Sequence, residues 1–421
     1  MLHANDPTVR TLLLQGEFGL ERESLRVDGD GFFSQTPHPL PEEPNIVRDF
    51  CENQTEINTP VCASIAQALD SLGSYDRMLR QQLARQPRPE YLWPFSSPPY
   101  IRGEEDIPIA QFFGCQAEKT TYREYLSRRY GRYKMTFSGI HVNFSFGQEL
   151  LRADFALTGG DNFQGYKDRL YLDLAAKAVK TGWVLTALTA ASPLLDSSFA
   201  ERGELGGDVF TGLGSVRCSE MGYWNSFTPI LDYTSPQTYG ASIQRYVDEG
   251  LLRAASELYY PVRLKPRGEN TLEALKDGVS HIELRMFDLN PLAPFGADER
   301  DLAFAQLLLV WLASTPEESF PPAEQVQAAQ NFKNAAHYDL RTVNLTAPNG
   351  GLYSIEQAGR RVLARMREFY TDFPLWVQQV LNFQEEKLLR PETRYAWQVR
   401  RRFSGGFVQK GLALAKGRQR E

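Results

Sequence analysis

The feature that most constrains this chain is a polar–apolar alternation that recurs in four segments with the character of β-strands. The segments span residues 18–27, 46–59, 138–146 and 280–289, and each is rich in β-branched or aromatic residues with a period near two. Residues two apart in a strand lie on the same face, so each segment has one apolar face and one face with charged or imidazole side chains. If the four strands neighbour one another in one sheet, we expect their polar faces to converge.

The first segment places Glu21 and Glu23 on one face of the strand, while Leu20 points to the other face. Two like charges side by side repel each other and lower stability. Two interpretations fit this pair. Either the acids face solvent and only improve solubility, or a cation lies between them.

The four polar faces together carry carboxylates, one imidazole and one guanidinium. These side chains are Glu21, Glu23, Asp49, Glu56, His141, Glu283 and Arg285. A single histidine such as His141 is more often structural than a ligand, so the argument depends on the recurrence across segments. Oxygen-rich sites with at most one imidazole suit Mg²⁺ or Mn²⁺ better than zinc. Several carboxylates can hold more than one ion, and such ions bind the phosphates of a nucleotide.

Between these segments the sequence has helical periodicity. Apolar residues repeat at three and four over 65–83, an Ala-rich stretch spans 166–192, and Asp298 is a candidate N-cap for a helix that runs to Trp311. From residue 320 to the end we expect helices, with a break at 349–351. Strands separated by long helical stretches without regular βαβ alternation predict an α+β fold with a mainly antiparallel sheet.

Composition excludes several functional classes. Hydrophobic residues make up 42% and charged residues 23% of the 421 residues, which is typical of a globular protein, and the net charge of −6 does not favour nucleic-acid binding. No apolar run is long enough for a membrane helix, and the first residues lack the pattern of a signal peptide, so we expect a cytoplasmic protein that binds neither membranes nor nucleic acid.

Other chemical motifs are absent or ambiguous. The four cysteines form no CxxC pair and show no zinc-site spacing, so we expect free thiols. The sequence contains no phosphate-binding P-loop, no dinucleotide fingerprint and no nucleophile elbow. The glycine-rich stretch 206–215 fits either a mobile loop near the site or an ordinary connection.

Several stretches resemble motifs of the bacterial glutamate–cysteine ligases, in family order and over roughly residues 16 to 300. They are Gly-Leu-Glu-Arg-Glu-Ser-Leu-Arg-Val at 19–27, Asp-Phe-Cys-Glu at 49–52, Trp-Pro-Phe-Ser-Ser-Pro-Pro-Tyr at 93–100, Tyr-Arg-Glu-Tyr-Leu at 122–126, Ser-Gly-Ile-His-Val-Asn-Phe-Ser at 138–145, Glu-Leu-Tyr-Tyr-Pro-Val-Arg at 257–263 and Ile-Glu-Leu-Arg-Met-Phe-Asp-Leu-Asn-Pro at 282–291.

The resemblance implies a glutamine-synthetase-like α+β fold in which a curved, mainly antiparallel sheet forms a funnel flanked by helices. It implies one catalytic domain over 1–421, with the site-bearing strands within 16–300 and a mainly helical region, 298–421, packed on it. The implied activity is ATP-dependent ligation of the glutamate γ-carboxylate to cysteine through a γ-glutamyl phosphate, as in glutathione biosynthesis. Magnesium or manganese, ATP and small-molecule substrates are the implied cofactor and partners, and we expect a monomer.

The resemblance also implies residue roles. Glu21, Glu23, Asp49, Glu56, His141 and Glu283 are expected to form the metal cluster, Arg285 to meet the transferring phosphoryl group, and Arg217 to bind the glutamate carboxylate. The side chains expected to shape the pocket for the incoming amine are Phe50, Tyr122, Leu126, Met135, Tyr223 and Tyr259.

The chain departs from the family pattern in places that bear on the amine. Met135 stands where the family usually has glutamine, and Val142 replaces a tyrosine, although strand parity points Val142 away from His141 and towards the core. The stretch between Asn225 and Glu257 is also shorter than in longer members. Two alternatives are therefore kept: a γ-glutamyl ligase for another amine or amino acid, and an inactive regulatory paralogue. The presence of every metal carboxylate and of Arg285 argues against the second.

Overall fold

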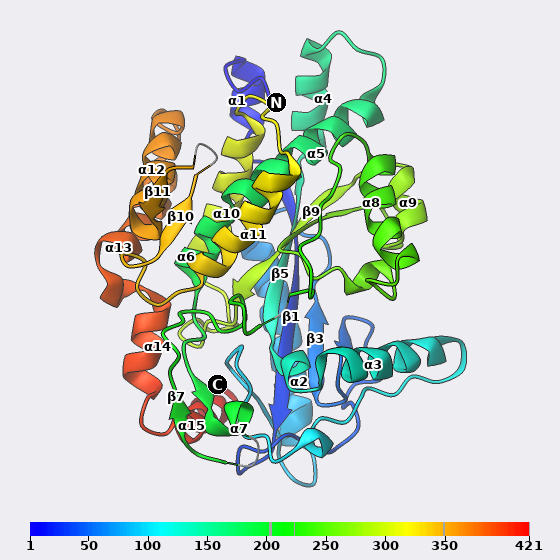
Figure 1. Cartoon of the computed structure of the whole chain (residues 1–421), viewed down its shortest axis with the longest axis vertical. Coiled ribbons are helices and arrows are strands. Elements are labelled where there is room, and N and C mark those ends of the chain that lie inside the picture. Colours follow the sequence, from blue (N-terminus) through cyan, green and yellow to red (C-terminus); the bar gives the residue numbers. More distant parts are fainter. Residues whose placement is uncertain (202–203, 223, 348–349, 421) are drawn as a thin grey trace.

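The computed structural model describes residues 1–201, 204–222, 224–347 and 350–420. Strand β1 (Gly16–Val27) is the centre of a seven-stranded, open antiparallel sheet (Figure 1). The strand order is β2-β3-β1-β5-β9-β8, and β4 pairs with the end of β1. The other strands are β2 (Ile46–Arg48), β3 (Gln54–Asn58), β4 (Tyr91–Leu92), β5 (Gly139–Phe146), β8 (Val262–Lys265) and β9 (His281–Asp288).

Three of the four predicted strands are confirmed, and the second is wrong as a single strand. Residues 46–59 instead form a hairpin in which β2 pairs with β3 and the chain reverses over 49–53. The backbone N–H of Gln54 donates to the Cys51 carbonyl at 3.0 Å, which closes this turn. Asp49 therefore projects from the turn, while Glu56 lies in the strand. Strand β8 was not predicted.

The alternation in β1 is anchored on its apolar side by a buried ion pair. Arg22, which lies between the two glutamates, pairs with Asp76 of α2 (Ile65–Ala84) at 2.6 Å, and Arg80 reaches the same carboxylate at 2.6 Å. All three side chains are buried. Leaving one of these charges unpaired in the interior would be strongly destabilising, so the pair fixes which face of β1 meets the helix.

A β-bulge in β9 changes the side-chain alternation next to the polar face. Ile140 of β5 pairs with Phe287, but Val142 pairs with Leu284, so β9 has one extra residue opposite His141. Bulges re-aim side chains and are common beside active sites. Met286, next to this irregularity, belongs to the same buried core as Ile282 and Leu284 and also lines the cavity beside Arg285.

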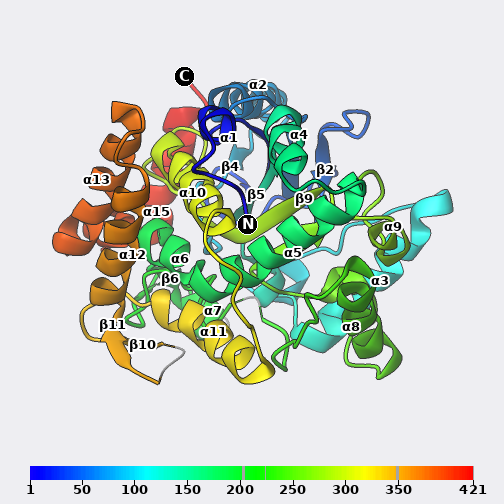
Figure 2. The same ribbon diagram turned by 90° about the horizontal axis from the view of Figure 1, so that it is seen from above.

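The apolar face of the sheet is covered by helices. Residues from β1, β3, β5 and β9 share one buried core with α2, α5 (Phe163–Thr181), α6 (Trp183–Thr189) and α10 (Glu299–Ala313), which pack against one another (Figure 2). Asp298 caps α10 as predicted, accepting from the backbone N–H of Arg300. Val142 lies in this core, on the side opposite the polar face.

The single helix expected over 166–192 is two helices divided at Gly182. A Cβ at this position would lie 3.0 Å from the Phe332 ring of α11 (Pro322–Ala335), so the glycine permits close packing at the junction. Glycine is also a weak helix former, which favours a break there.

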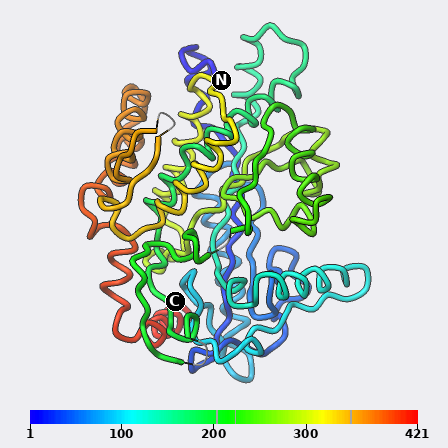
Figure 3. Tube along the Cα trace, in the orientation of Figure 1, coloured from blue at the N-terminus to red at the C-terminus, as the bar shows by residue number. Residues whose placement is uncertain are grey.

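The C-terminal region is mainly helical, as predicted, with one small hairpin that was not. Its elements are β10 (Asn344–Thr346), β11 (Leu352–Ser354), α12 (Ile355–Phe369), α13 (Leu375–Leu389), α14 (Tyr395–Phe403) and α15 (Phe407–Arg418). The predicted break at 349–351 falls on the link between β10 and β11, where residue 349 lies outside the described residues. Helix α13 packs on α10, and α15 returns to contact β4 near the end of β1 (Figure 3).

The remaining elements are short or peripheral. They are α1 (Pro7–Leu12), α3 (Ala117–Tyr130), α4 (Gln148–Leu157), β6 (Leu195–Asp196), α7 (Ser197–Ala200), β7 (Asp208–Val209), α8 (Pro236–Asp248) and α9 (Leu272–Lys276). None of the helices in the described part of the chain combines the length and apolar character needed to cross a membrane.

Candidate active site

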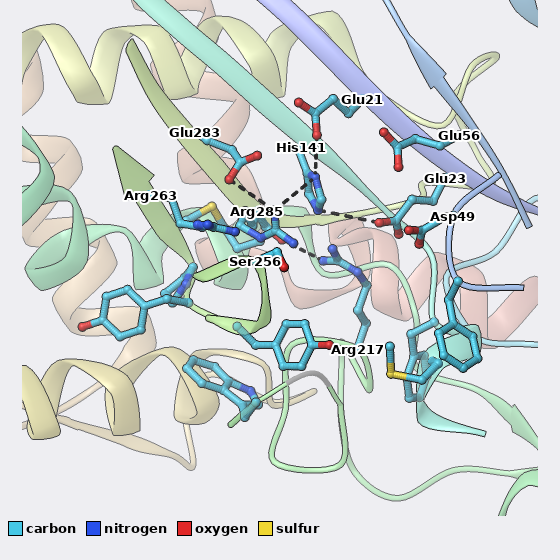
Figure 4. A pocket seen from close by; sticks show the side chains of 18 of the residues that line it. Glu21, Glu23, Asp49, Glu56, His141, Arg217, Ser256, Arg263, Glu283 and Arg285 are labelled. Carbon is cyan, nitrogen blue, oxygen red and sulfur yellow. Dashed lines mark hydrogen bonds and ion pairs between the residues drawn. The ribbon is translucent and has the colours of Figure 1, made fainter. Parts of the chain in front are cut away.

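The polar faces of the sheet converge on one cavity of about 310 Å³, as the alternation predicted (Figure 4). The predicted site residues that line it are Glu21, Glu23, Asp49, Phe50, Glu56, Tyr122, Leu126, Met135, His141, Arg217, Tyr259, Glu283 and Arg285. Tyr223, the remaining predicted residue, lies outside the described residues. The structure thus brings together every predicted residue that it describes.

The candidate metal ligands form two separate triads. Glu21, His141 and Glu283 offer donor atoms within 4.8 Å of one another. A second triad of carboxylates, from Glu23, Asp49 and Glu56, has the same spacing. Five carboxylates and one imidazole form a hard donor set that fits Mg²⁺ or Mn²⁺, and two triads leave room for more than one ion.

His141 joins the two triads. Its Nδ1 lies 2.9 Å from Glu21 Oε2, and its Nε2 lies 3.8 Å from Glu23 Oε1. Burial, the largest single influence, would raise the pKa of Glu21, but the hydrogen bond and charge of His141 together with the charge of Lys265 outweigh it and lower that pKa. Glu23 also accepts from the backbone N–H of Gly139 at 2.7 Å, which fixes one of its oxygens.

The carboxylates of the second triad repel one another. Burial and the neighbouring acids, Asp49 first, raise the pKa of Glu56 well above its ordinary value of 4.5. The pKa of Glu23 is raised in the same way by burial, with Asp49 contributing. Like charges this close favour a bound proton or a bound cation.

Cations surround Glu283 instead. Its carboxylate is fully buried and lies 3.2 Å from Arg285 Nη1 and 3.0 Å from Lys265 Nζ. Burial would raise the pKa of Glu283, but these cations lower it well below its ordinary value. Burial lowers the pKa of Arg285, yet Glu283, Glu21 and Glu23 raise it above its ordinary value, so the guanidinium stays charged.

Arg217 occupies space that only a glycine leaves open. A Cβ at Gly139 would lie 2.1 Å from the Arg217 Cζ atom. The guanidinium donates to the Arg285 carbonyl at 2.9 Å and to the Phe287 carbonyl at 3.3 Å. The buried carboxylate of Asp288 accepts from the hydroxyl of Ser215, two residues before Arg217, at 2.9 Å. The loop that carries Arg217 is thereby tied to the end of β9.

The alternation rule missed two cations of the site, Arg263 and Lys265, because β8 was not predicted. Both line the cavity, and their alternation with Val262 and Leu264 carries the same signal as the other strands. Apart from Met286 of β9, the remaining lining residues lie outside the strands, where no period of two marks them. They include Arg123, Cys218, Trp224, Ser256, Tyr260 and Asn270.

The glycine-rich stretch 206–215 does not line the cavity itself. Part of it, Asp208–Val209, forms β7 and pairs with β6. Leu213 packs with Phe137 and Val216 in a small core below the loop that carries Arg217. Its contribution to the site is therefore indirect.

Known proteins similar in sequence to this chain point to one family. A family model described as glutamate-cysteine ligase matches residues 2–249 and 227–335. The glutathione biosynthesis bifunctional protein GshAB of Listeria monocytogenes is 36% identical over 429 residues, covering 98% of this chain and 55% of that protein. The protein of the same name from Clostridium perfringens is 32% identical and covers 86% of this chain and 48% of its own length. The chain thus spans about half the length of the curated relatives it matches.

Solved structures agree with the fold. A bifunctional glutathione synthetase from Pasteurella multocida superposes with a TM-score of 0.85 at 27% identity, covering 99% of this chain and 54% of that one. A glutamate–cysteine ligase from Francisella tularensis, solved in complex with AMP, superposes with a TM-score of 0.87 at 21% identity, covering 96% and 88%. These likenesses confirm the glutamine-synthetase-like α+β fold expected from the sequence.

The two triads predict opposite responses to neutralisation. In metal-free protein with EDTA, Glu56→Gln should raise Tm by roughly 1–3 °C, because it relieves repulsion. Glu283→Gln should lower Tm, because it leaves Arg285 and Lys265 without their buried partner. Thermal unfolding of both variants measures this, with Glu386→Gln, in an exposed pair with Arg390, as the control. Shifts of the same sign in both variants would contradict the charge distribution described here.

The same carboxylate predicts a pH dependence. Above pH 4.5, Glu56 is ionised in the unfolded chain but still protonated in the folded, metal-free protein until its raised pKa is passed. The folded state binds more protons than the unfolded state in this window, so the contribution of Glu56 to the free energy of unfolding falls as the pH rises. Glu56→Gln should flatten this part of the Tm–pH curve. If the Tm of Glu56→Gln falls with pH as steeply as that of the wild type, groups other than Glu56 cause the loss of stability.

Proposed function

The chain belongs to the glutamate–cysteine ligase family, and from that premise we propose that it joins the γ-carboxylate of glutamate to an amine at the expense of ATP, with cysteine as the expected amine. The observation that carries the proposal is the pair of carboxylate triads, with Arg285 beside the buried carboxylate of one of them. The products would be γ-glutamylcysteine, ADP and phosphate.

The two triads would hold Mg²⁺ or Mn²⁺. Bound there, such ions would neutralise phosphate charge and polarise the transferred group. The donor chemistry supports this role, since five of the six side chains supply hard carboxylate oxygens and the sixth supplies one imidazole. The repulsion within the second triad supports it further, because it favours a bound cation.

The first chemical step overcomes the poor electrophilicity of a carboxylate. An oxygen of the glutamate γ-carboxylate attacks the γ-phosphorus of ATP, the bond to the β-phosphate oxygen breaks, and ADP leaves with γ-glutamyl phosphate in place. Negative charge on the phosphoryl oxygens is in transit during this step. Arg285 stays charged and faces the cavity, so it is positioned to offset that charge. Arg217, held by backbone carbonyls beside Gly139, would bind the glutamate α-carboxylate.

The second step transfers the acyl group. The amine attacks the acyl carbon, the acyl–phosphate bond breaks, phosphate leaves, and the amine nitrogen loses a proton. Water competes for the same intermediate and must be excluded. The region of the cavity lined by Phe50, Tyr122, Leu126, Met135 and Tyr259 is aromatic and apolar, which suits an amine subsite that keeps water out.

The lining of the cavity bears on the two alternatives, a ligase for another amine and an inactive paralogue. Met135 is 3% exposed and lines it, so a family departure reaches the site, and a γ-glutamyl ligase for another amine is kept as the second candidate. Val142 lies in the core and says nothing about the amine. An inactive paralogue is disfavoured, because the candidate ligands and Arg285 converge. The cytoplasmic location, the monomeric state and the single catalytic domain over 1–421 stay predictions.

The decisive experiment measures ADP release with ATP, glutamate and a panel of amines, in Mg²⁺ and in Mn²⁺. We expect release that needs both glutamate and metal and is fastest with cysteine. Hydroxylamine provides a parallel test, because it converts γ-glutamyl phosphate into a hydroxamate that is detected by colour. Absence of both glutamate-dependent ADP release and hydroxamate would refute the ligase. If another amine outcompetes cysteine, the protein is instead the second candidate, a γ-glutamyl ligase for that amine.

Arg285→Lys should impair the phosphoryl step selectively. Lysine keeps the charge but loses the planar fork of donors. We expect kcat to fall by roughly 10²–10³-fold, as for loss of a preorganised donor, while the glutamate KM changes much less. Arg341→Lys, which alters an exposed pair with Asp339, is the matched control. Normal kcat with a raised glutamate KM would reassign Arg285 to substrate binding.

Met135→Gln should narrow the choice of amine. A glutamine can donate and accept hydrogen bonds, whereas a thioether is only a weak acceptor. A hydrogen bond to a charged group is worth about 1.5–3 kcal/mol, so kcat/KM for cysteine relative to alkylamines, which lack the carboxylate, should rise by roughly tenfold or more, with 2-aminobutyrate compared alongside. Met78→Gln, on an exposed face of α2, is the control. An unchanged ratio would remove Met135 from the specificity of the site.

A further inference from the structure

Helix α3 forms one wall of the candidate amine subsite but has little apolar anchoring. Tyr122 and Leu126 lie one turn apart on its cavity side. Leu126 is the one buried residue of this helix, which projects from the body of the molecule (Figure 1). Tyr122, Tyr125 and Tyr130 pack only partly buried against the neighbouring core, so polar contacts add to the apolar ones in setting the position of this wall.

One polar contact lies at the end of α3, where the last residues of the helix meet the fully buried carboxylate of Glu257. Tyr130 Oη donates to Glu257 Oε1 at 2.7 Å, and Arg129 Nε lies 3.2 Å from the same oxygen. The backbone N–H of Arg253 donates to Oε2 at 2.6 Å. Both carboxylate oxygens are therefore partnered, as a buried charge requires.

The same residue is joined to the opposite wall of the subsite. Asn225 Nδ2 donates to the Glu257 carbonyl at 2.8 Å, and Asn225 Oδ1 accepts from the backbone N–H of Tyr259 at 2.9 Å. The rings of Tyr130 and Tyr259 meet edge to face with centroids 5.5 Å apart. Glu257 thus connects the end of α3 to the segment that carries Tyr259.

A further contact closes the two walls nearer the cavity. Ser256 Oγ donates to Tyr122 Oη at 3.1 Å. Glu257 itself, with Tyr130 and Asn225, does not line the cavity. Any effect of Glu257 on a substrate must therefore act through the lining residues of α3 and of the segment 256–259, among them Tyr122, Leu126 and Tyr259.

We propose that Glu257 is a positioning residue for the amine subsite, because it locks the two walls of that subsite at a fixed separation. The inference rests on the proposed ligase function and goes beyond it, since no metal, phosphate or glutamate contact is involved. Burial and the hydrogen bond to Glu257 raise the pKa of Tyr130 to about 12, so its hydroxyl remains a donor throughout the working pH range. Small misplacements of substrate groups can cost up to about a hundredfold in rate.

The test compares Glu257→Gln with wild type in steady-state kinetics. The substitution keeps the shape but removes the charge that Arg129 meets. We expect the amine KM to rise by roughly tenfold, while the KM values for glutamate and ATP stay within about twofold. Hydroxamate formation at saturating hydroxylamine should stay within about threefold, because this small nucleophile does not need the aromatic walls. Glu249→Gln, in an exposed pair with Arg245, is the matched control.

A graded variant protects the test against misfolding. Tyr130→Phe removes one hydrogen bond to Glu257 and keeps the ring, so it should raise the amine KM in the same direction by a smaller factor. If Glu257→Gln is insoluble, this variant decides the outcome. An unchanged amine KM, or an equal loss in all three KM values and in hydroxamate formation, would overturn the positioning role. Wild-type protein that forms no hydroxamate would instead overturn the ligase function, which separates the two failures.

Discussion

Repulsion among carboxylates on one face of the central sheet is the constraint that the rest of the structure has to meet. β1 brings Glu21 and Glu23 to that face, and the hairpin beside it adds Asp49 and Glu56. Such a face is stable only if cations approach it or protons bind to it. The two triads differ in how their charge is balanced. Strands β8 and β9 bring Lys265 and Arg285 to Glu283 of the first triad, whereas Glu56 of the second triad keeps a pKa raised well above its ordinary value. The unbalanced triad is thus the one most suited to bind a metal ion.

The helices serve this arrangement from the other side of the sheet. Arg22, between the two glutamates of β1, turns away from the site and pairs with Asp76 of α2 in the interior. A one-residue slip of β1 would place Arg22 in the acidic cavity and bury both glutamates against the helices. The buried pair of Arg22 and Asp76 therefore stabilises the observed register of β1 and disfavours the shifted one. It makes the acidic face a consequence of core packing as well as of the site's own chemistry.

The sequence predicted the site better than it predicted the elements around it. Period-two alternation identified β1, β5 and β9 and the convergence of their polar faces, because each of these strands has one face in the core. It failed at the turn over 49–53, which divides the predicted second strand, and at the short strand that carries Arg263 and Lys265. The amine-side residues Tyr122, Leu126 and Met135 could be proposed only from the family resemblance, since they come from helical and irregular segments in which no period of two marks the face that lines the site.

This difference in how residues are held suggests a division within the proposed enzyme. The candidate phosphoryl-transfer residues lie in or beside a hydrogen-bonded sheet, where a shift of one side chain disturbs its neighbours on both sides. The candidate amine residues lie on α3 and on the segment around Tyr259, which are joined to each other through one buried carboxylate and a few hydrogen bonds. No strand of the sheet passes through this second region, although α3 contacts the second triad through the hydrogen bond from Arg123 Nε to the Asp49 carbonyl at 2.5 Å. Met135 lines the cavity but belongs to neither triad, so this departure is compatible with unchanged phosphoryl chemistry and would act on the choice of amine.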